Sequence, residues 1–107
     1  MNYNVIATVR FEKEIKKLIK KYPSLKNEYS LLIELLQRNP SEGIGIGHSC
    51  YKIRVAISSK GKGKSGGARV ITFTYIVKRT VYLLTIYDKS DIDTISDQEL
   101  LNILKEI

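Results

Sequence analysis

The spacing of apolar residues changes near the middle of this chain, and that change constrains the fold more than any other feature. Before Pro40, apolar residues recur every three or four positions, as Phe11, Ile15 and Leu18 do, which is typical of amphipathic helices. From Tyr51 onward they alternate with polar residues, which is typical of strands with one buried face. The sequence therefore predicts an α+β domain in which helices come first and a sheet follows.

Two helices are expected before Pro40, after a short β-prone run over residues 3–9. The first begins near Phe11 and ends before Pro23, because the residue preceding a proline avoids the α region. The second begins near Ser24 and ends at Asn39-Pro40. Amphipathic helices joined at a tight proline turn are expected to pack as an antiparallel hairpin.

The remainder of the chain is expected to form three strands and one helix. The segments with strand character are residues 51–58, 69–77 and 80–87. Their short connections imply an antiparallel meander with a tight turn at Lys78-Arg79, whereas residues 41–49 are expected to be a glycine-rich loop. Ser96 and Glu99 have the capping-box spacing that starts a C-terminal helix. The predicted architecture is β-αα-βββ-α, one domain over residues 1–107 with its helices packed on one face of a mostly antiparallel sheet.

Positive charge is concentrated in the middle of the chain. Eighteen Lys and Arg residues against eleven Asp and Glu residues give a net charge of +7. Six basic residues and no acid lie between Lys52 and Arg69, whereas acids outnumber bases from Asp88 onward. Such a local field attracts nucleic acid, an acidic protein or anionic lipid. Because the basic residues alternate with glycine and serine rather than with bulky apolar residues, a membrane-surface helix is a poor explanation.

The expected compartment follows from features that the sequence lacks. No apolar run approaches the roughly 20 residues that span a bilayer. The N-terminus has no basic region followed by a long apolar stretch, and Cys50 is the single cysteine, which fits a reducing compartment. We therefore expect a cytoplasmic protein with no membrane partner.

The lysine–glycine segment from Ser59 to Gly67, called the basic loop below, is the strongest functional candidate. Its Gly63-Lys64-Ser65 run resembles part of a nucleotide-binding P-loop. That motif requires glycine where this chain has Ser58, and it requires a following helix, whereas β-branched residues follow here. A nucleotide site is therefore rejected, and no small-molecule cofactor is expected.

A loop that contacts nucleic-acid phosphates explains the same segment better. Its glycines let backbone amides approach a ligand closely. The cations expected to contact phosphates are Lys52, Arg54, Lys60, Lys62 and Lys64. The alternative is a flexible, solvated hairpin tip whose lysines only keep the sheet soluble.

Arg69 and Tyr87 are further candidates beside the basic loop. Arg69 begins a strand, where a rigid backbone could aim its guanidinium at a phosphate, although an edge arginine paired with a C-terminal acid would look the same. Arg54 on the neighbouring strand has the same two interpretations. Tyr87 lies where the last strand becomes a loop and could stack on a base, although aromatic residues on sheets more often pack in a core.

His48 and Cys50 do not make a site by themselves. His48 could act as a general acid or base, or it could be an ordinary exposed loop histidine. One histidine and one cysteine are too few ligands for a metal, and a Cys–His nucleophile pair would lack a third, orienting group. No metal site is expected.

Three segments together carry a resemblance to a known family. They are residues 51–56 (YKIRVA), 59–71 (SKGKGKSGGARVI) and 83–90 (LLTIYDKS). The chain resembles the RelE/ParE toxin superfamily of bacterial type II toxin–antitoxin systems, and within it the HigB-type branch. The resemblance covers the whole chain in the order of its elements. It implies a RelE-like fold and a cognate antitoxin protein as partner.

Many members of that superfamily cleave messenger RNA in the ribosomal A site, without a metal, through attack of a ribose 2′-hydroxyl on the adjacent phosphate. This chemistry needs cations that stabilise a phosphorane and groups that transfer protons. By resemblance, Arg69 matches a phosphate-stabilising arginine, and the loop lysines lie where family lysines contact the RNA backbone. The catalytic residues that the resemblance implies are Arg69, Lys62, Lys64, Lys89 and Tyr87.

The leading hypothesis is therefore a ribosome-dependent mRNA endoribonuclease that inhibits translation and is held inactive by an antitoxin. Its partners would be the antitoxin, mRNA and the ribosome. Members of the ParE type instead inhibit DNA gyrase, which requires no acid–base pair, and they supply the second hypothesis. A basic nucleic-acid-binding module without toxicity is the third.

Overall fold

The computed structural model describes residues 2–61, 63–92 and 94–107. Its helices and strands, in chain order, are β1 (Asn4–Ala7), α1 (Val9–Lys21), α2 (Leu25–Arg38), β2 (Ile44–Gly47), β3 (Cys50–Val55), β4 (Ala68–Tyr75), β5 (Thr80–Asp88) and α3 (Asp97–Leu104). The α+β class predicted from the sequence is confirmed. Among the described residues, no helix is long and apolar enough to cross a membrane.

The two N-terminal helices form where the apolar periodicity predicts them. Thr8 caps α1, because its side chain accepts a hydrogen bond from the backbone N of Phe11 (3.2 Å). The turn at Pro23 separates α1 from α2, as expected. At the other end of the chain, the helix start predicted at Ser96 is confirmed, because the Ser96 hydroxyl accepts a hydrogen bond from the backbone N of Glu99 (3.1 Å) and caps α3.

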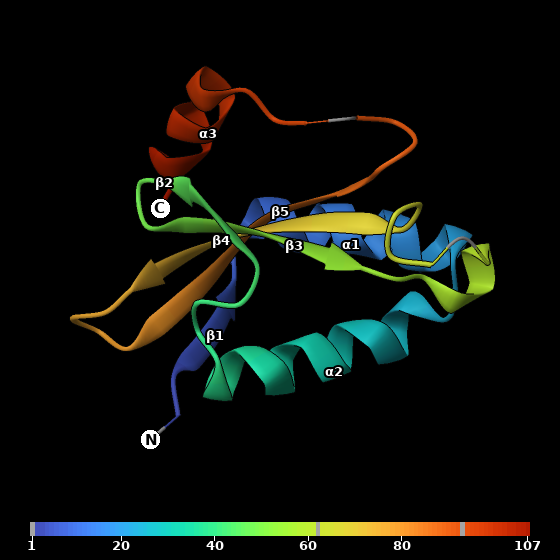
Figure 1. The fold of residues 1–107 in the computed structure, drawn as a ribbon, viewed down its shortest axis with the longest axis horizontal. Helices are drawn as coiled ribbons and strands as arrows, with labels where there is room; N and C mark the ends of the chain where they lie inside the picture. The colour runs from blue at the N-terminus through green and yellow to red at the C-terminus, as the bar shows by residue number, and fades with distance from the viewer. Residues whose placement is uncertain (1, 62, 93) are drawn as a thin grey trace.

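The strands form one five-stranded sheet in the order β1-β5-β4-β3-β2. β1 pairs parallel with β5, with Asn4 opposite Thr80, and every other neighbouring pair is antiparallel. The sheet is therefore mostly antiparallel, as predicted. The N-terminal strand reaches its edge position beside the last strand, far away in sequence (Figure 1).

The prediction of a loop without strands over residues 41–49 is wrong. Residues Ile44–Gly47 form the edge strand β2, in which Ile44 lies opposite Lys52 of β3. The strand escaped notice because glycine contributes little to strand propensity. Gly43 has a packing reason of its own: a Cβ at this position would lie 2.4 Å from the carbonyl oxygen of Lys52.

The prediction that all helices cover one face of the sheet is also wrong. Side chains of α1 and α2 form one core with the sheet, including Phe11, Ile15, Leu36, Val70 and Leu83. Side chains of α3 form a second core with the other face, including Ile71, Leu84, Tyr87, Leu100 and Ile103. Figure 1 accordingly shows α2 and α3 on opposite sides of the sheet. The physical reason is that β4 and β5 are buried along nearly their whole length, so they need cover on both faces.

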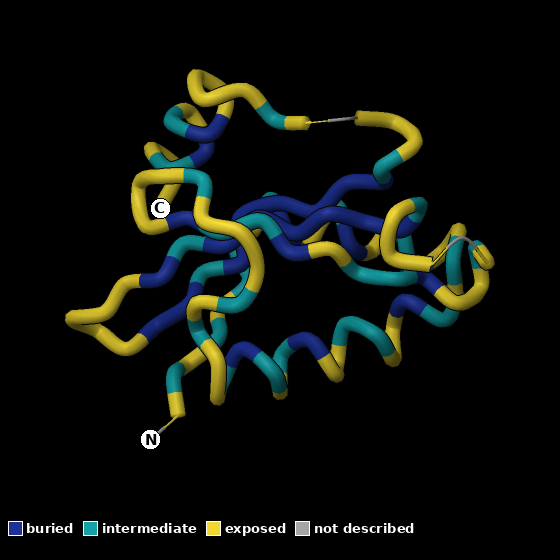
Figure 2. Tube along the Cα trace, in the orientation of Figure 1, coloured by how far each residue is buried: buried dark blue, intermediate teal, exposed yellow. Residues whose placement is uncertain are grey.

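The β4–β5 hairpin forms one end of the sheet. Its turn is longer than the predicted Lys78-Arg79 pair, because residues 76–79 connect the strands and the backbone N of Arg79 donates to the carbonyl oxygen of Ile76 (3.0 Å). This tip is exposed, whereas the middle of the sheet is buried (Figure 2). The basic loop lies at the opposite end of the sheet, beside the α1–α2 turn (Figure 1).

Candidate phosphate-binding site

The basic loop connects β3 to β4 and begins with a short 3-10 turn. That turn, Ser58–Lys60, ends at Gly61, and the chain rejoins the sheet at Ala68. Gly61 and Gly63 have φ angles of +74° and +64°, a region that other residues adopt only at a cost. Lys62, predicted to bind RNA and to act in catalysis, lies outside the described residues.

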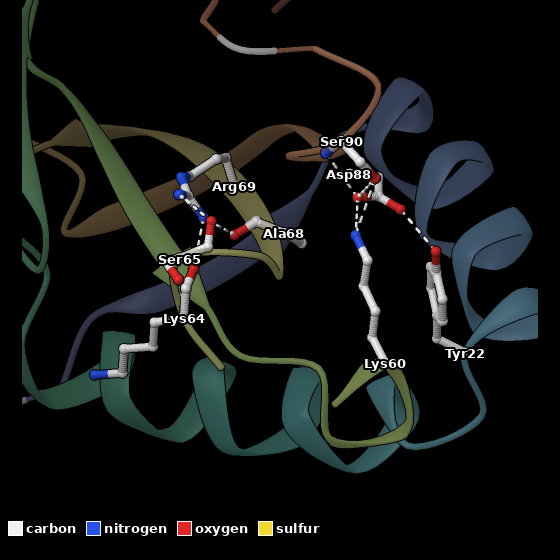
Figure 3. Close-up of polar contacts among 8 residues, drawn as sticks. All are labelled: Tyr22, Lys60, Lys64, Ser65, Ala68, Arg69, Asp88 and Ser90. Atoms are coloured by element: carbon white, nitrogen blue, oxygen red, sulfur yellow. Dashed lines mark hydrogen bonds and ion pairs between the residues drawn. The ribbon is translucent and has the colours of Figure 1, made fainter. Parts of the chain in front are cut away.

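Arg69 holds the C-terminal end of the basic loop. Its side chain is buried, and its Nη1 donates to the carbonyl oxygens of Lys64 (2.9 Å) and Ala68 (3.1 Å) while Nη2 donates to that of Ser65 (3.2 Å). These bonds use three of the five N–H donors of a guanidinium. Arg69 therefore begins the strand where it was predicted to, but its first observed role is to fix the loop backbone (Figure 3).

Three of the predicted site residues lie side by side across the sheet. Arg54 of β3 is opposite Arg69 of β4, and Arg69 is opposite Tyr87 of β5. Arg54 is exposed, whereas Tyr87 is buried in the core that α3 covers. The aromatic ring of Tyr87 thus has the core-packing position considered as its alternative, and its role in proton transfer stays a prediction.

Lys60 holds the N-terminal end of the basic loop. Its Nζ forms an ion pair with the carboxylate of Asp88, the last residue of β5, and also donates to Ser90 Oγ (3.0 Å). The side chains of Lys60 and Asp88 are 9% and 1% exposed. Tyr22, at the end of α1, donates its hydroxyl to the other carboxylate oxygen of Asp88 (2.8 Å), and its ring lies 5.6 Å from Lys60 Nζ. The positive charge of Lys60 is therefore compensated within the protein (Figure 3).

The surroundings of Asp88 favour its charged form. Burial alone would raise the pKa of this carboxyl. The hydrogen bonds from Lys60, Ser90 and Tyr22 outweigh burial and hold the pKa well below its usual range. The sequence shows no acid between Lys52 and Arg69, but the fold brings Asp88 to the base of the basic loop.

The 3-10 turn is also bound to the start of α2. The backbone N and the hydroxyl of Ser58 both donate to Glu28 Oε2 (2.7 Å each). The backbone N of Ser59 donates to Ser24 Oγ (2.9 Å), and the backbone N of Ser24 donates to Ser59 Oγ (3.2 Å). Successive residues 58, 59 and 60 are thus each tied to another part of the fold, so the start of the loop is not the free hairpin tip of the alternative hypothesis.

Among the candidate cations that the structure describes, Lys64 and Arg54 are exposed. Both line a surface groove of about 290 Å³ between α2 and β3, whose lining also includes Glu28 and Glu42. The Lys64 side chain extends away from the Arg69 and Asp88 clusters (Figure 3). These two residues have the accessibility that phosphate contact requires.

Three further candidate residues lie at the border of the basic loop or away from it. Lys89 lies at the border, and Lys52 and His48 lie away from it. Lys52 is half-buried and lines a small pocket of about 200 Å³ beside Ser96 and Asp97 at the start of α3. Lys89 follows β5, and its backbone N donates to the carbonyl oxygen of Gly67 (3.0 Å), which closes the loop at its C-terminal end. His48 Nε2 lies 3.5 Å from Asp97 Oδ1.

Three residues that organise the site were missed in the sequence. Each bonds to a residue far away in sequence: Tyr22 lies 66 residues from Asp88, Glu28 lies 30 residues from Ser58, and Asp88 lies 28 residues from Lys60. No periodicity or spacing rule connects positions so far apart, and only the fold brings them together. Among the described residues, no group of three or more His, Cys, Asp or Glu side chains is placed to hold a metal ion.

The fold and the loop geometry are those of a small α+β domain that presents basic residues at one end of its sheet. Two solved structures have a similar fold. A free-state double mutant of the E. coli toxin RelE matches with a TM-score of 0.66 at 16% identity, over 100% of this chain and 99% of that one. The isolated E. coli RelE toxin matches with a TM-score of 0.57 at 20% identity, over 98% and 99%.

The sequence also matches a family model. Residues 11–107 match the family described as the RelE toxin of the RelE / RelB toxin–antitoxin system. The chain therefore belongs to the RelE toxin family, and the resemblance stated from its motifs is confirmed at this level.

Proposed function

We propose that this chain is a ribosome-dependent mRNA endoribonuclease that acts without a metal and inhibits translation. The observation that carries the proposal is the row Arg54–Arg69–Tyr87 across three strands, directly beside a loop whose Lys64 is exposed. Rigid strands can hold cations at a fixed distance from a phosphorane, and preorganised charge is the main requirement of this chemistry. Family membership adds support, because many RelE/ParE members cleave mRNA.

The exposed cations carry phosphate binding in this proposal. Arg54 and Lys64 contact the RNA backbone, and Arg69 supports them from below, because its buried guanidinium holds the loop backbone and adds positive charge beneath the scissile phosphate. Lys89, and Lys62 in the part of the loop that the structure leaves undescribed, are proposed for proton transfer together with Lys64. Lys60 contributes by holding the loop, because its charge is paired with Asp88.

The test is cleavage of a defined mRNA on purified ribosomes, mapped by primer extension. We expect wild-type protein to cut, and Arg54→Ala and Lys64→Ala each to lower the rate by about 10²-fold, the usual loss when one charge stabiliser is removed. Lys78→Ala is the matched control, because Lys78 is an exposed cation at the opposite end of the sheet. Failure of wild-type protein to cut mRNA on ribosomes would end the enzymatic proposal.

The same preparation separates the rival functions. Inhibition of DNA supercoiling by gyrase, without RNA cleavage, would select the ParE-type function. The burial of Tyr87 is the observation that favours this rival, because gyrase inhibition needs no proton-transfer group. Normal growth on induced expression, with nucleic-acid binding retained, would select the non-toxic binding module.

An antitoxin is proposed as the protein partner, in keeping with the toxin–antitoxin family. A small protein encoded beside this one should restore growth when both are expressed. If the neutralising contact covers the exposed cations, the complex should lose RNA binding together with toxicity.

A further inference from the structure

Both ends of the basic loop meet the chain where β5 ends, at the neighbouring residues Asp88 and Lys89. At the N-terminal end, Lys60 forms its ion pair with the carboxylate of Asp88. At the C-terminal end, the carbonyl oxygen of Gly67 accepts a hydrogen bond from the backbone N of Lys89 (3.0 Å). We call this arrangement of Lys60, Gly67, Asp88 and Lys89 the neck of the loop. Since the neck closes on consecutive residues, a shift at Asp88 moves both ends of the loop.

The Asp88 carboxylate is built into the protein rather than offered to a ligand. The residue is 2% exposed. It accepts hydrogen bonds from Lys60 Nζ, Tyr22 Oη (2.8 Å), Ser90 N (3.0 Å) and Ser90 Oγ (2.7 Å). Donors from α1, from the loop and from the segment after β5 therefore converge on one side chain. A carboxylate so enclosed cannot touch RNA, so any effect on the reaction passes through the residues that it holds.

Neither stability nor RNA affinity explains an acid at this place. Burying an ion pair costs about as much as the pair returns, and apolar replacements are often neutral or better. An acid at the base of a basic loop also weakens the attraction for a polyanion. The carboxylate instead fixes the position of the loop beside Tyr87 and Lys89, the two residues that flank Asp88 in the sequence.

We propose that Asp88 is a positioning residue that closes the neck of the basic loop and thereby sets the distance between the loop cations and the Arg54–Arg69–Tyr87 row. This inference rests on the proposed function for its catalytic consequence. Its structural consequence, an ordered loop, is measurable without RNA.

The experiment compares wild-type protein with Asp88→Asn in two readouts. The first is amide hydrogen exchange in residues 61–67, measured on the protein alone. The second is single-turnover mRNA cleavage on ribosomes, which separates the maximal rate from the half-saturating concentration. We expect exchange in the loop to rise at least about tenfold. We expect the maximal rate to fall by about 10²-fold, the loss that a misplacement of about 1 Å can cause, while RNA affinity stays equal or tightens.

Asp91→Asn is the matched control. Asp91 is an exposed acid three residues further on, so this variant changes the net charge equally and leaves the neck intact. It should tighten RNA binding slightly and leave both the maximal rate and loop exchange at their wild-type values.

Two further variants, Lys60→Met and Tyr22→Phe, change the partners of Asp88 instead of Asp88 itself. Lys60→Met removes the loop partner of Asp88, and Lys60→Met/Asp88→Asn should lose no more activity than Asp88→Asn alone, because Asp88→Asn already breaks the ion pair that Lys60→Met removes. Tyr22→Phe removes one donor and keeps the ion pair, so it should show a smaller effect in both readouts. If Asp88→Asn fails to fold, Lys60→Met and Tyr22→Phe carry the same test.

The outcomes of these measurements decide whether Asp88 has the positioning role, separately from whether the proposed function is right. Unchanged loop exchange in Asp88→Asn, or losses that add up in the double variant, would overturn the positioning role. A weaker RNA affinity with an unchanged maximal rate would also overturn it. If wild-type protein cleaves no RNA, the proposed function fails, and loop exchange still decides whether Asp88 closes the neck.

Discussion

The ends of the basic loop and its middle both contain cations, but these cations differ in burial and in the groups that bind them. At the ends, Lys60 and Arg69 are buried, and protein oxygens bind their charged groups. In the middle, Lys64 is exposed and follows Gly63, which has a positive φ. Charge by itself therefore does not mark a phosphate-binding residue. Burial and partners separate the cations that hold the loop from the cations that are available to a ligand.

The two ends also differ from each other. A carboxylate holds Lys60, whereas neutral backbone carbonyls hold Arg69. The stability that the first attachment contributes depends on pH, because Asp88 takes up a proton when the chain unfolds in acid, whereas the second attachment contains no titrating acid. Three predictions test this comparison, beginning with the largest expected effect on the free energy of unfolding.

Gly67→Ala should be the most damaging change in the loop. A Cβ at Gly67 would lie 2.1 Å from the carbonyl oxygen of Val55 and 3.1 Å from Ala56 Cα, both backbone atoms that cannot swing aside. We expect a loss of about 3 kcal/mol in the free energy of unfolding, the upper part of the usual range for overpacking. Urea denaturation measures it.

Gly63→Ala is the control from the middle of the loop. A Cβ at Gly63 has no neighbouring atom within 4 Å, so the cost is only that of a side chain at φ +64°. That cost is about 1 kcal/mol. Equal losses at Gly63 and Gly67 would contradict the distinction between the tight end and the open middle.

Arg69→Ala should destabilise the fold by about 2 kcal/mol, because it removes a buried donor group from two loop carbonyls and the carbonyl of Ala68. Arg54→Ala, directly opposite on β3 but exposed, should change the free energy of unfolding by less than about 0.5 kcal/mol. Thermal and urea unfolding of both variants check the difference. If the two losses are equal, Arg69 is not the clamp that its contacts indicate.

Acid should lower the free energy of unfolding through Asp88. The pKa of Asp88 is lowered in the folded state, so the unfolded state binds the proton more readily, and stability falls as the pH drops below the unfolded value of about 3.9. From that unfolded value, the contribution of Asp88 lost between pH 7 and pH 3 is about 1 kcal/mol. Urea midpoints of wild type and Asp88→Asn across this range measure it. Parallel curves for the two proteins would show that Asp88 contributes no pH-dependent stability.

Local patterns predicted the helices and the central strands well. The periodicity from Phe11, the turn at Pro23 and the N-cap at Ser96 depend on neighbours within four residues, and all three are confirmed. The missed strand β2 contains alternating glycines, which hide the two isoleucines of an edge strand. The side of the sheet that α3 covers depends on how β4 and β5 are buried, and alternation along one strand does not reveal it.

The sequence predicted which residues belong to the candidate site better than it predicted what each of them does. The motif from Tyr51 to Arg69 led to the family, which is confirmed, and it placed Arg54 and Arg69 on adjacent strands. The sequence did not show that Asp88 would neutralise Lys60, or that Arg69 would turn toward the loop carbonyls. Those contacts form only where distant segments of the chain meet at the neck, and patterns among neighbouring residues do not predict such meetings.

The position of β1 beside β5 has a consequence for the order of events during synthesis. β1 is synthesised first, but it can pair with β5 only after Thr80 and the residues that follow it have been made. Pairing between segments so far apart in the sequence is slow to form. Asp88 and Lys89, which close the neck, belong to the same late segment. A nascent chain that has made both helices and the whole basic loop would therefore still lack an ordered site.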